Sequence, residues 1–519
     1  MTAHAAPHGA FDVTEKTVAQ LQAAMVSGKT SAQQLVQLYL ARIATIDKTG
    51  PRLNSIIELN PDALATATAL DAERRSKGPR GPLHGIPVLL KDNIATADRM
   101  QTTAGSLALV GVKPPRDAFL VARLRAAGAV ILGKTNLSEW ANMRSTRSTS
   151  GWSARGGLTR NPYALDRNTS GSSSGSGASI AASLAAVAVG TETDGSITSP
   201  ASVASLVGIK PTVGLVSRAG VIPIAQSQDT AGPMARTVAD AAVLLSAMAG
   251  SDARDPASAL ADQKKTDYTR FLDRDGLRGK RIGVVRSQLT ASSDWVAALV
   301  ESQLAVLTAQ GATLVDVPEI PNAEKYADTE LTVLLYELKA GMASYLADYG
   351  PKAPIRSLAD VIAYNEKHRA TEMPFFAQEH FVNAQAKGGL DSQEYRDALA
   401  NNQRYAREEG IDLVMKEHRL DALVAPTCGA AWLTDFINGD ASGNSFTSPA
   451  AVAGYPHITV PCGFVQGLPC GLSFVAGAWA EGPLIAMAYA YEQASPQRKA
   501  PRYPKSVNLR AATRPRATP

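Results

Sequence analysis

Serine and glycine dominate one short segment of this 519-residue chain, SGSSSGSGAS at residues 170–179. Six of its ten residues are serines and three are glycines, and the apolar sequence IAASLAAVAV follows directly. Hydroxyl groups on a glycine-rich backbone suit a flexible linker, a phosphate-binding loop or a loop that holds nucleophilic serines. The flanking residues decide among these three roles.

The residues on either side count against the first two roles. A flexible linker has no reason to run directly into a strongly apolar helix and strand. A P-loop requires a lysine after its last glycine, and none follows here. The dinucleotide pattern G-x-G-x-x-G also fails, because Ile180 stands where the third glycine belongs. The loop that holds hydroxyl groups near chemistry remains.

A second small-residue turn, GTETDGSITSPAS, follows at residues 190–202. We expect a helix over residues 179–184 and a strand to residue 190, which bring the two segments together. The turn Asp194-Gly195-Ser196 can point successive backbone N–H groups at one spot, as an oxyanion requires. Ser196 then stands where a nucleophile would stand. From this turn alone, a turn-forming serine without chemistry is the more frequent alternative.

A serine nucleophile needs a base, and the chain offers histidine or lysine. None of the seven histidines accompanies a G-x-S-x-G elbow, so a Ser/His/Asp triad has little support. Lys91 ends the apolar run GIPVLLK, which predicts a buried strand. Burial disfavours an ammonium, so Lys91 is a candidate neutral base, and a buried pair with Asp92 is an equal alternative. No His/Asp/Glu cluster has metal-ligand spacing, so we predict neither metal nor cofactor.

Composition and charge exclude several function classes. The chain is 45% hydrophobic and 19% charged, and no run approaches the ~18 apolar residues of a membrane span. The first residues lack signal-peptide features, and three cysteines without pairing fit a reducing, cytoplasmic location. Seven basic residues and no acid lie from Arg498 onward, and without them the net charge of +5 becomes −2. We therefore expect no nucleic-acid partner and a solvated basic end.

The remaining sequence indicates the elements that must position these residues. Residues 13–25 and 31–46 predict amphipathic helices, with Thr30 or Ser31 as a cap and Gln34 closing a capping box. Apolar runs then alternate with helical patterns up to a closing helix, PLIAMAYAYEQA. This order predicts the α/β class, with a mostly parallel sheet between helices. We interpret the polar segment 251–265 as an internal loop of one large domain.

Taken together, these motifs resemble the amidase signature family of hydrolases. The residues concerned are GPLHGIPVLLKDNI, GAVILGKTNLSEWA, the block from SGSSSGSG to GIKPTVGLVS, SQDTAGPMART and AGYPHITVPCGF. The resemblance implies one three-layer α/β/α domain with a mixed sheet over residues 13–495. It places the signature core at about 80–250 and a substrate-pocket portion at about 280–440. A flexible N-terminus (1–12) and a basic Pro-rich tail (496–519) would flank that domain.

The same resemblance implies a catalytic triad of Ser196 as nucleophile, Ser172 as bridging serine and Lys91 as base. The family's bridging serine follows a cis peptide, here between Gly171 and Ser172, and Ser173 would support the loop. The implied oxyanion hole is made by the backbone N–H groups of Thr193, Asp194, Gly195 and Ser196. Many members read TDTGGSIR where this chain reads TETDGSIT, so Asp194 and Thr198 depart from the common pattern.

The variant turn, with EWANMRS and SGWSARGG, is most similar to bacterial peptide amidases, which hydrolyse the C-terminal amide of peptides. The expected partner is therefore a small-molecule or peptide amide, and the expected state is a monomer or simple homo-oligomer. Alternatives are a hydrolase of aryl acylamides, fatty-acid amides or carbamates, and the glutaminase subunit of an amidotransferase. Residues 320–440 are the expected source of the pocket wall, with Tyr336, Tyr345 and Phe375 among its candidates.

Overall fold

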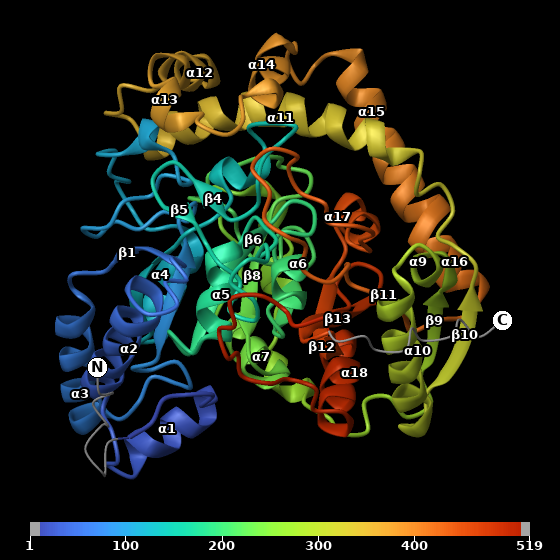
Figure 1. The fold of residues 1–519 in the computed structure, drawn as a ribbon, viewed down its shortest axis with the longest axis horizontal. Helices are drawn as coiled ribbons and strands as arrows, with labels where there is room; N and C mark the ends of the chain where they lie inside the picture. The colour runs from blue at the N-terminus through green and yellow to red at the C-terminus, as the bar shows by residue number, and fades with distance from the viewer. Residues whose placement is uncertain (1–10, 510–519) are drawn as a thin grey trace.

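The computed structural model describes residues 11–509, and these form one eleven-stranded sheet that lies among helices (Figure 1). The strands of this sheet are β1 (Ile56–Leu59), β2 (Pro87–Lys91), β3 (Val130–Thr135), β6 (Val187–Glu192), β7 (Val207–Lys210), β8 (Thr230–Ala235), β9 (Arg281–Val285), β10 (Thr313–Val317), β11 (Ala422–Pro426), β12 (His457–Val465) and β13 (Leu468–Val475). A separate small hairpin joins β4 (Trp152–Ser153) to β5 (Gly157–Leu158).

The order of the strands is β1-β3-β2-β6-β8-β7-β12-β13-β11-β9-β10. This mixed sheet confirms the α/β class, but the expectation of a mostly parallel sheet is wrong. Within the described part, six of the ten neighbouring pairs are antiparallel. The reason is the late hairpin β12–β13 and the returning strands β7 and β8, which reverse direction without a crossover helix. Parallel pairing survives at β3-β2-β6 and at β11-β9-β10.

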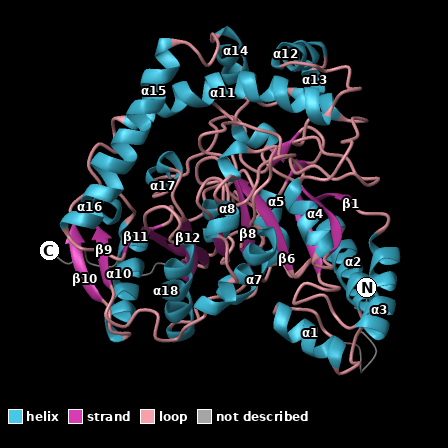
Figure 2. Cartoon of the chain, turned by 180° about the vertical axis from the view of Figure 1, so that it is seen from behind, coloured by secondary structure: helices cyan, strands magenta, loops and turns pink. Residues whose placement is uncertain are grey.

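Helices cover the sheet and extend beyond it. Their bounds are α1 (Val18–Val26), α2 (Ala32–Arg42), α3 (Ala63–Lys77), α4 (Phe119–Ala126), α5 (Ser174–Ala181), α6 (Thr198–Ser202), α7 (Val238–Met248), α8 (Ala261–Lys264), α9 (Arg286–Thr290), α10 (Asp294–Ala309), α11 (Tyr326–Tyr349), α12 (Leu358–Lys367), α13 (Arg369–Glu372), α14 (Glu379–Ala386), α15 (Gln393–Gln403), α16 (Asp412–Glu417), α17 (Ser448–Ala453) and α18 (Glu481–Ala494). Helices α11 to α15 form an arch along one side of the molecule, seen from both directions in Figures 1 and 2.

Strands β2, β3 and β6 are buried along their whole length, which explains their continuous apolar runs. Strand β2 pairs in parallel with β6, so that Val88 lies beside Val187 and Leu90 beside Val189. The carboxyl ends of the two strands therefore meet at one edge. Lys91 and Thr191 lie at that edge, and this is where the signature residues gather.

The serine-rich segment differs from the expected loop, because helix α5 already begins at Ser174. The chain had suggested a helix only from residue 179, since serine and glycine are poor helix formers. Close packing compensates: a Cβ at Gly175 would lie 2.3 Å from the Ser55 carbonyl oxygen and 2.5 Å from that of Asn136. Glycine is thus required where the helix meets two neighbouring backbones.

The structure describes only part of the two predicted chain ends. Most of the predicted N-terminal segment 1–12 and the last ten residues of the predicted tail lie outside the described residues. Within the described tail, Arg498 is only partly exposed and pairs with Glu15 at 2.8 Å, so this residue is not the solvated cation we expected. Ser31 caps α2 by accepting from the Gln34 N–H. The domain bounds remain a prediction.

Three further features concern the described residues as a whole. No helix within residues 11–509 is long and apolar enough to cross a membrane. The three cysteines, Cys428, Cys462 and Cys470, are buried free thiols. The same residues contain no group of three or more His, Cys, Asp or Glu side chains arranged to hold a metal ion.

The packing of α5 makes a direct prediction for Gly175→Ala. The added methyl group meets rigid backbone, and overpacking of this kind costs about 1–3 kcal/mol, so the unfolding temperature should fall by several degrees. Gly81→Ala is the matched control, because nothing lies within 4 Å of a Cβ at that position. Thermal unfolding followed by circular dichroism checks the difference. Equal unfolding temperatures for the two variants would contradict the packing described here.

Candidate active site

Lys91 is fully buried at the end of β2, and its ammonium group faces neutral oxygens. Its Nζ donates to Ser172 Oγ at 2.8 Å, to Thr191 Oγ1 at 2.9 Å and to the Thr191 carbonyl at 3.2 Å. Burial lowers the pKa of Lys91 to about 7, although the charges of Asp229 and Glu192 act in the opposite direction. The lowered pKa favours the neutral amine as the pH rises above about 7.

The alternative that Lys91 pairs with Asp92 is wrong. The Asp92 carboxylate points elsewhere, where it accepts from the Thr103 hydroxyl and the Gly105 N–H and pairs with Arg155 at 3.3 Å. Consecutive residues of a strand project to opposite sides, and the end of β2 follows this rule. Among residues 11–509, no carboxylate therefore lies within hydrogen-bond distance of the Lys91 amine.

Ser172 lies directly beside this lysine and is inaccessible to solvent. The peptide bond between Gly171 and Ser172 is cis, as the family resemblance implied. A Cβ at Gly171 would lie 2.2 Å from Ser138 Oγ, so the Ser138 side chain would have to move for any other residue at this position. The backbone carbonyl of Ser172 accepts from the Ser138 N–H at 3.1 Å. These contacts fix the direction of the Ser172 hydroxyl.

Ser173 connects the two small-residue segments. Its N–H donates to the Ser196 carbonyl at 3.1 Å, and its hydroxyl donates to the Thr191 carbonyl at the same distance. The Thr191 N–H in turn donates to Ser173 Oγ at 3.2 Å. The structure therefore brings Lys91, Ser172 and the turn that carries Ser196 together. Among the described residues, no hydrogen bond joins the hydroxyl groups of Ser172 and Ser196.

The turn before Ser196 leaves backbone donors free. No acceptor in the described part of the chain bonds the N–H groups of Asp194, Gly195 and Ser196. Gly195 has a φ of +73°, and a Cβ there would lie 2.9 Å from Thr447 Oγ1. Both the positive φ and this close approach favour glycine at the position. Ser196 remains 8% exposed. Free N–H groups beside a reachable hydroxyl can hold an oxyanion.

Glu192 anchors the far side of this turn, and the sequence reasoning missed it. Its Oε2 accepts from the N–H groups of Ile197 at 2.7 Å and Thr198 at 2.9 Å. Burial raises the pKa of this carboxyl, and the charge of Lys210 opposes the rise. The segment TETDGS does show an acidic residue at a position expected to be buried. That observation alone does not predict that Glu192 accepts from backbone N–H groups of the turn, because a buried acid can have several other roles.

Asp229 and Gln228, in the SQDTAGPMART motif, support the turn from the other side and were also missed. Asp229 accepts from the Thr193 hydroxyl at 2.6 Å and from the Ile224 N–H at 2.8 Å. Burial raises the pKa of Asp229 to about 6. Gln228 Nε2 donates to the Thr193 carbonyl at 3.3 Å. Thr193 is thus held by its side chain and its carbonyl.

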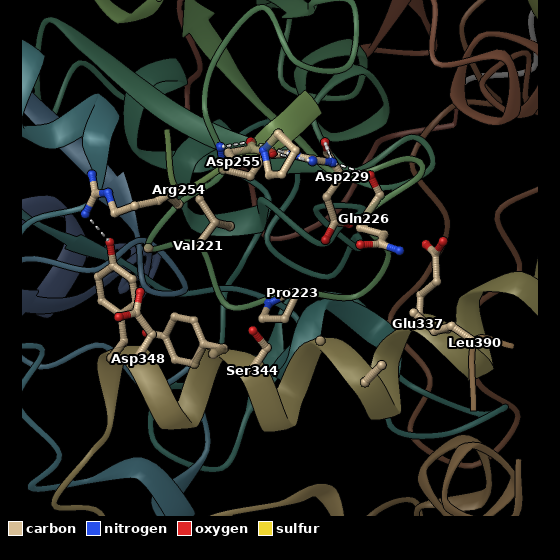
Figure 3. Close-up of a pocket in the computed structure, with 18 residues that line it drawn as sticks. Val221, Pro223, Gln226, Asp229, Arg254, Asp255, Glu337, Ser344, Asp348 and Leu390 are labelled. Carbon is tan, nitrogen blue, oxygen red and sulfur yellow. Dashed lines mark hydrogen bonds and ion pairs between the residues drawn. The ribbon is translucent and has the colours of Figure 1, made fainter. Parts of the chain in front are cut away.

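A cavity of about 480 Å³ begins beyond Asp229 and lies against α11 (Figure 3). In this view Val221, Pro223 and Gln226 face Ser344 and Asp348 of the helix. The lining includes Asp229 but none of the three residues implied as a triad. The cavity is therefore a neighbour of the Thr193 support and not the place of the serines.

The three aromatic candidates for a pocket wall have different surroundings. Tyr345 lines the cavity beside α11. Tyr336 packs against Tyr395 between α11 and α15, with ring centroids 5.6 Å apart. Phe375 is 45% exposed and stacks on Phe436 at 4.0 Å. None of these contacts places the three rings in one pocket.

Comparisons with known proteins agree with this fold. The family model described as Amidase matches residues 34–485. The solved structure of native peptide amidase from Stenotrophomonas maltophilia is 54% identical, with a TM-score of 0.91, over 94% of this chain and 99% of that one. A probable amidase of Arabidopsis thaliana is 43% identical over 95% of this chain and 92% of its own length. A glutamyl-tRNA(Gln) amidotransferase subunit of Symbiobacterium thermophilum is 35% identical over 93% of this chain and 98% of its own length.

The large mixed sheet, the buried lysine and the serine-bearing turns define a protein of the amide-hydrolysing class. The length of the family match and the sequence identity to the relatives establish the family of the chain. The chain belongs to the amidase family, as its sequence motifs had indicated.

The contacts of Glu192 generate a prediction that does not depend on catalysis. Glu192→Ala leaves two buried N–H groups without an acceptor, each costing about 1–3 kcal/mol, so the unfolding temperature should drop clearly. Glu192→Gln retains an acceptor oxygen and should lose much less. Thermal unfolding of both variants provides the comparison. A drop that is the same for alanine and glutamine would refute the anchoring role.

Proposed function

We propose that this amidase hydrolyses the C-terminal carboxamide of peptides, giving a free acid and ammonia, by an acyl-enzyme on Ser196. The observation that carries the proposal is the buried Lys91 with its Nζ 2.8 Å from Ser172 Oγ, next to the turn of Ser196, and burial lowers the pKa of this lysine to about 7. A neutral amine and two hydroxyl groups can pass protons without any cofactor.

In the first step, the Ser196 hydroxyl attacks the amide carbonyl of the substrate. Its proton passes to Ser172 Oγ while the Ser172 proton passes to Lys91, which becomes an ammonium. Because the described structure has no hydrogen bond between the two hydroxyl groups, the Ser196 side chain must rotate toward Ser172 as substrate binds. Hydrogen bonds of a catalytic set commonly tighten in this way only in the complex.

The negative oxygen of the tetrahedral intermediate accepts from the free N–H groups of the turn. Asp194, Gly195 and Ser196 provide three such donors, which are fixed before the reaction, so their reorientation costs little. Thr193 belongs to the same turn and completes the proposed oxyanion hole. Lys91 then returns its proton through Ser172 to the leaving nitrogen. Water cleaves the acyl-enzyme by the same route in reverse.

Similarity supports peptide amides as the substrate class more than the alternatives. Identity to the Stenotrophomonas peptide amidase is 54%, whereas identity to the Symbiobacterium amidotransferase protein is 35%. We propose accordingly that the protein acts without a partner chain, as a monomer or simple homo-oligomer. The support for this substrate class is sequence similarity. Hydrolysis of aryl acylamides, fatty-acid amides or carbamates instead is therefore an alternative result of the test.

The proposal is tested by offering the purified protein an N-protected dipeptide amide together with the matching p-nitroanilide. We expect the peptide amide to gain about one mass unit, since NH2 is exchanged for OH, while the anilide reacts far more slowly. Ser196→Ala should lower the rate by about a thousandfold or more, because the nucleophile is gone. Mass spectrometry follows both substrates in one vessel.

The controls separate the competing functions. Cleavage of the anilide alone, lost in Ser196→Ala, would retain the nucleophile and reject the peptide-amide assignment. Release of ammonia from glutamine only in the presence of a partner chain would favour the amidotransferase role. Wild-type rates in Ser196→Ala would overturn the mechanism.

Lys91 also predicts a pH dependence. The base must be neutral, and its pKa is lowered to about 7, so kcat/KM should fall as the pH drops through about 7. Thr191→Val removes the hydroxyl that accepts from Nζ at 2.9 Å and stabilises the ammonium, so the acidic limb should move to lower pH. Initial rates from pH 5 to 9 at constant ionic strength measure both profiles.

Lys91→Arg provides the control for this profile, because its guanidinium stays protonated throughout this range. We expect it to lose about a hundredfold or more in kcat/KM at every pH. An acidic limb that Thr191→Val leaves in place, or an active Lys91→Arg protein, would show that another group titrates.

A further inference from the structure

Two carboxyl groups lie close enough beside the proposed oxyanion turn for one to act on the pKa of the other. Asp194 lies two residues before Ser196, and its Oδ2 accepts from the Ser448 hydroxyl of α17 at 2.6 Å. Glu330 lies on α11, and its Oε1 accepts from Gln228 Nε2 at 2.8 Å. That same Nε2 also donates to the Thr193 carbonyl, so Gln228 connects Glu330 to the turn. Both acidic residues are partly exposed.

The charge at this place is not compensated by the chain. Within residues 11–509, neither Asp194 nor Glu330 forms an ion pair. Lys210, whose charge acts to lower the pKa of Asp194, donates its ammonium to the carbonyls of Tyr455 at 2.6 Å and Pro211 at 3.2 Å. Burial and the charge of Asp194 raise the pKa of Glu330 well above its usual range, and burial raises the pKa of Asp194.

Within the part of the chain that the structure describes, buried oxygens around the two acids also lack hydrogen-bond partners. Asp194 Oδ1 and Gln228 Oε1 are buried acceptors without a hydrogen bond. The hydroxyl of Tyr326, a residue only 2% exposed, has no partner either. It lies close enough to both acids that their charges, together with burial, raise the pKa of the phenol. Buried polar atoms are rarely left in this state, so each unpartnered oxygen here requires an explanation.

The four residues of this cluster, called the acidic subsite, are Asp194, Gln228, Tyr326 and Glu330. We propose that the acidic subsite binds a small nitrogen cation with several N–H donors, namely ammonium or a primary alkylammonium. Such a group places a positive charge beside the two carboxyl groups, which form no ion pair with the described residues. Its three or four N–H groups match the unpartnered oxygens, and each would make a charge-assisted hydrogen bond.

Two sources of this cation are chemically open, and they share the same recognition. One is the ammonium formed when the amide nitrogen leaves, which rests on the proposed function. The other is a basic side chain of the substrate itself. A quaternary ammonium has the same charge but no N–H donor. If the subsite recognises its ligand by hydrogen bonds, it should bind a primary ammonium better than a quaternary one. If it only attracts positive charge, the two cations should bind alike.

The experiment measures hydrolysis of a neutral N-protected dipeptide amide with added methylammonium chloride or tetramethylammonium chloride, at constant ionic strength. We expect methylammonium to inhibit at concentrations about tenfold or more below those of tetramethylammonium, because only it donates hydrogen bonds. Glu330→Gln should weaken this inhibition about tenfold, and Tyr326→Phe should weaken it by a smaller factor. Asp328→Asn is the matched control, since it removes one exposed acid from the same helix.

A second arm identifies the source of the cation. The ratio of kcat/KM for a peptide ending in lysinamide to that for one ending in norleucinamide compares a basic side chain with a neutral one of similar length. A high ratio that falls in Glu330→Gln assigns the subsite to the substrate side chain. A ratio near one, with inhibition by methylammonium retained, assigns it to the released ammonium.

A third measurement keeps the inference independent of turnover. Methylammonium should raise the unfolding temperature of the Ser196→Ala protein, and tetramethylammonium should not, because a ligand that binds the folded state stabilises it. If peptide amides are not hydrolysed but this shift occurs, the proposed function fails and the subsite stands. If the two cations act alike on rate and on unfolding, and Glu330→Gln leaves the lysinamide ratio unchanged, the subsite is refuted.

Discussion

The burial of the Lys91 amine without a carboxylate partner is the constraint on which the site depends. An ammonium at this depth loses its hydration, and its contacts are hydroxyl and carbonyl oxygens that replace only part of it. Asp229 and Glu192 act on it as more distant charges and do not restore the usual pKa. The amine is thereby kept close to its neutral form, ready to accept a proton, by its position in the sheet. A carboxylate at hydrogen-bond distance would remove this property.

The sheet provides that position through its parallel portion. Strands β2 and β6 run side by side in the same direction, so Lys91 and Thr191 reach the same edge. Helix α5 packs against both strands, and it begins at Ser174, shortly after the cis bond before Ser172. The antiparallel strands β8 and β7 continue the sheet and hold the turn of Ser196 through its neighbours. The mixed topology is thus a requirement of the site as well as a description of the fold.

Local sequence and the family resemblance together predicted the site residues but not their surroundings. The apolar run before Lys91 predicted its burial, and the glycines marked turns whose backbones approach other segments closely. The direction of the late strands was not predictable, because an apolar run of five residues reads the same in parallel and antiparallel sheets. Glu192, Gln228 and Asp229 were missed since their partners are backbone groups of distant or folded segments. The described start of the tail was misjudged for a similar reason, since Glu15 lies 483 residues from Arg498.

Asp194 is a residue whose charge is unfavourable for the proposed chemistry, and its surroundings in the fold reduce that effect. A carboxylate two residues before a nucleophile places negative charge beside the turn proposed to hold an oxyanion, which disfavours the developing charge. The structure moderates this by giving one oxygen to Ser448 and by surroundings that raise the pKa of the carboxyl. Glu330 adds a second acid instead of a cation, so the moderation is incomplete within the chain itself. One positive group supplied from outside would offset the charge of one acid, and burial beside Asp194 raises the pKa of the other, Glu330. The site would then be electrostatically complete only when a nitrogen-bearing molecule occupies it.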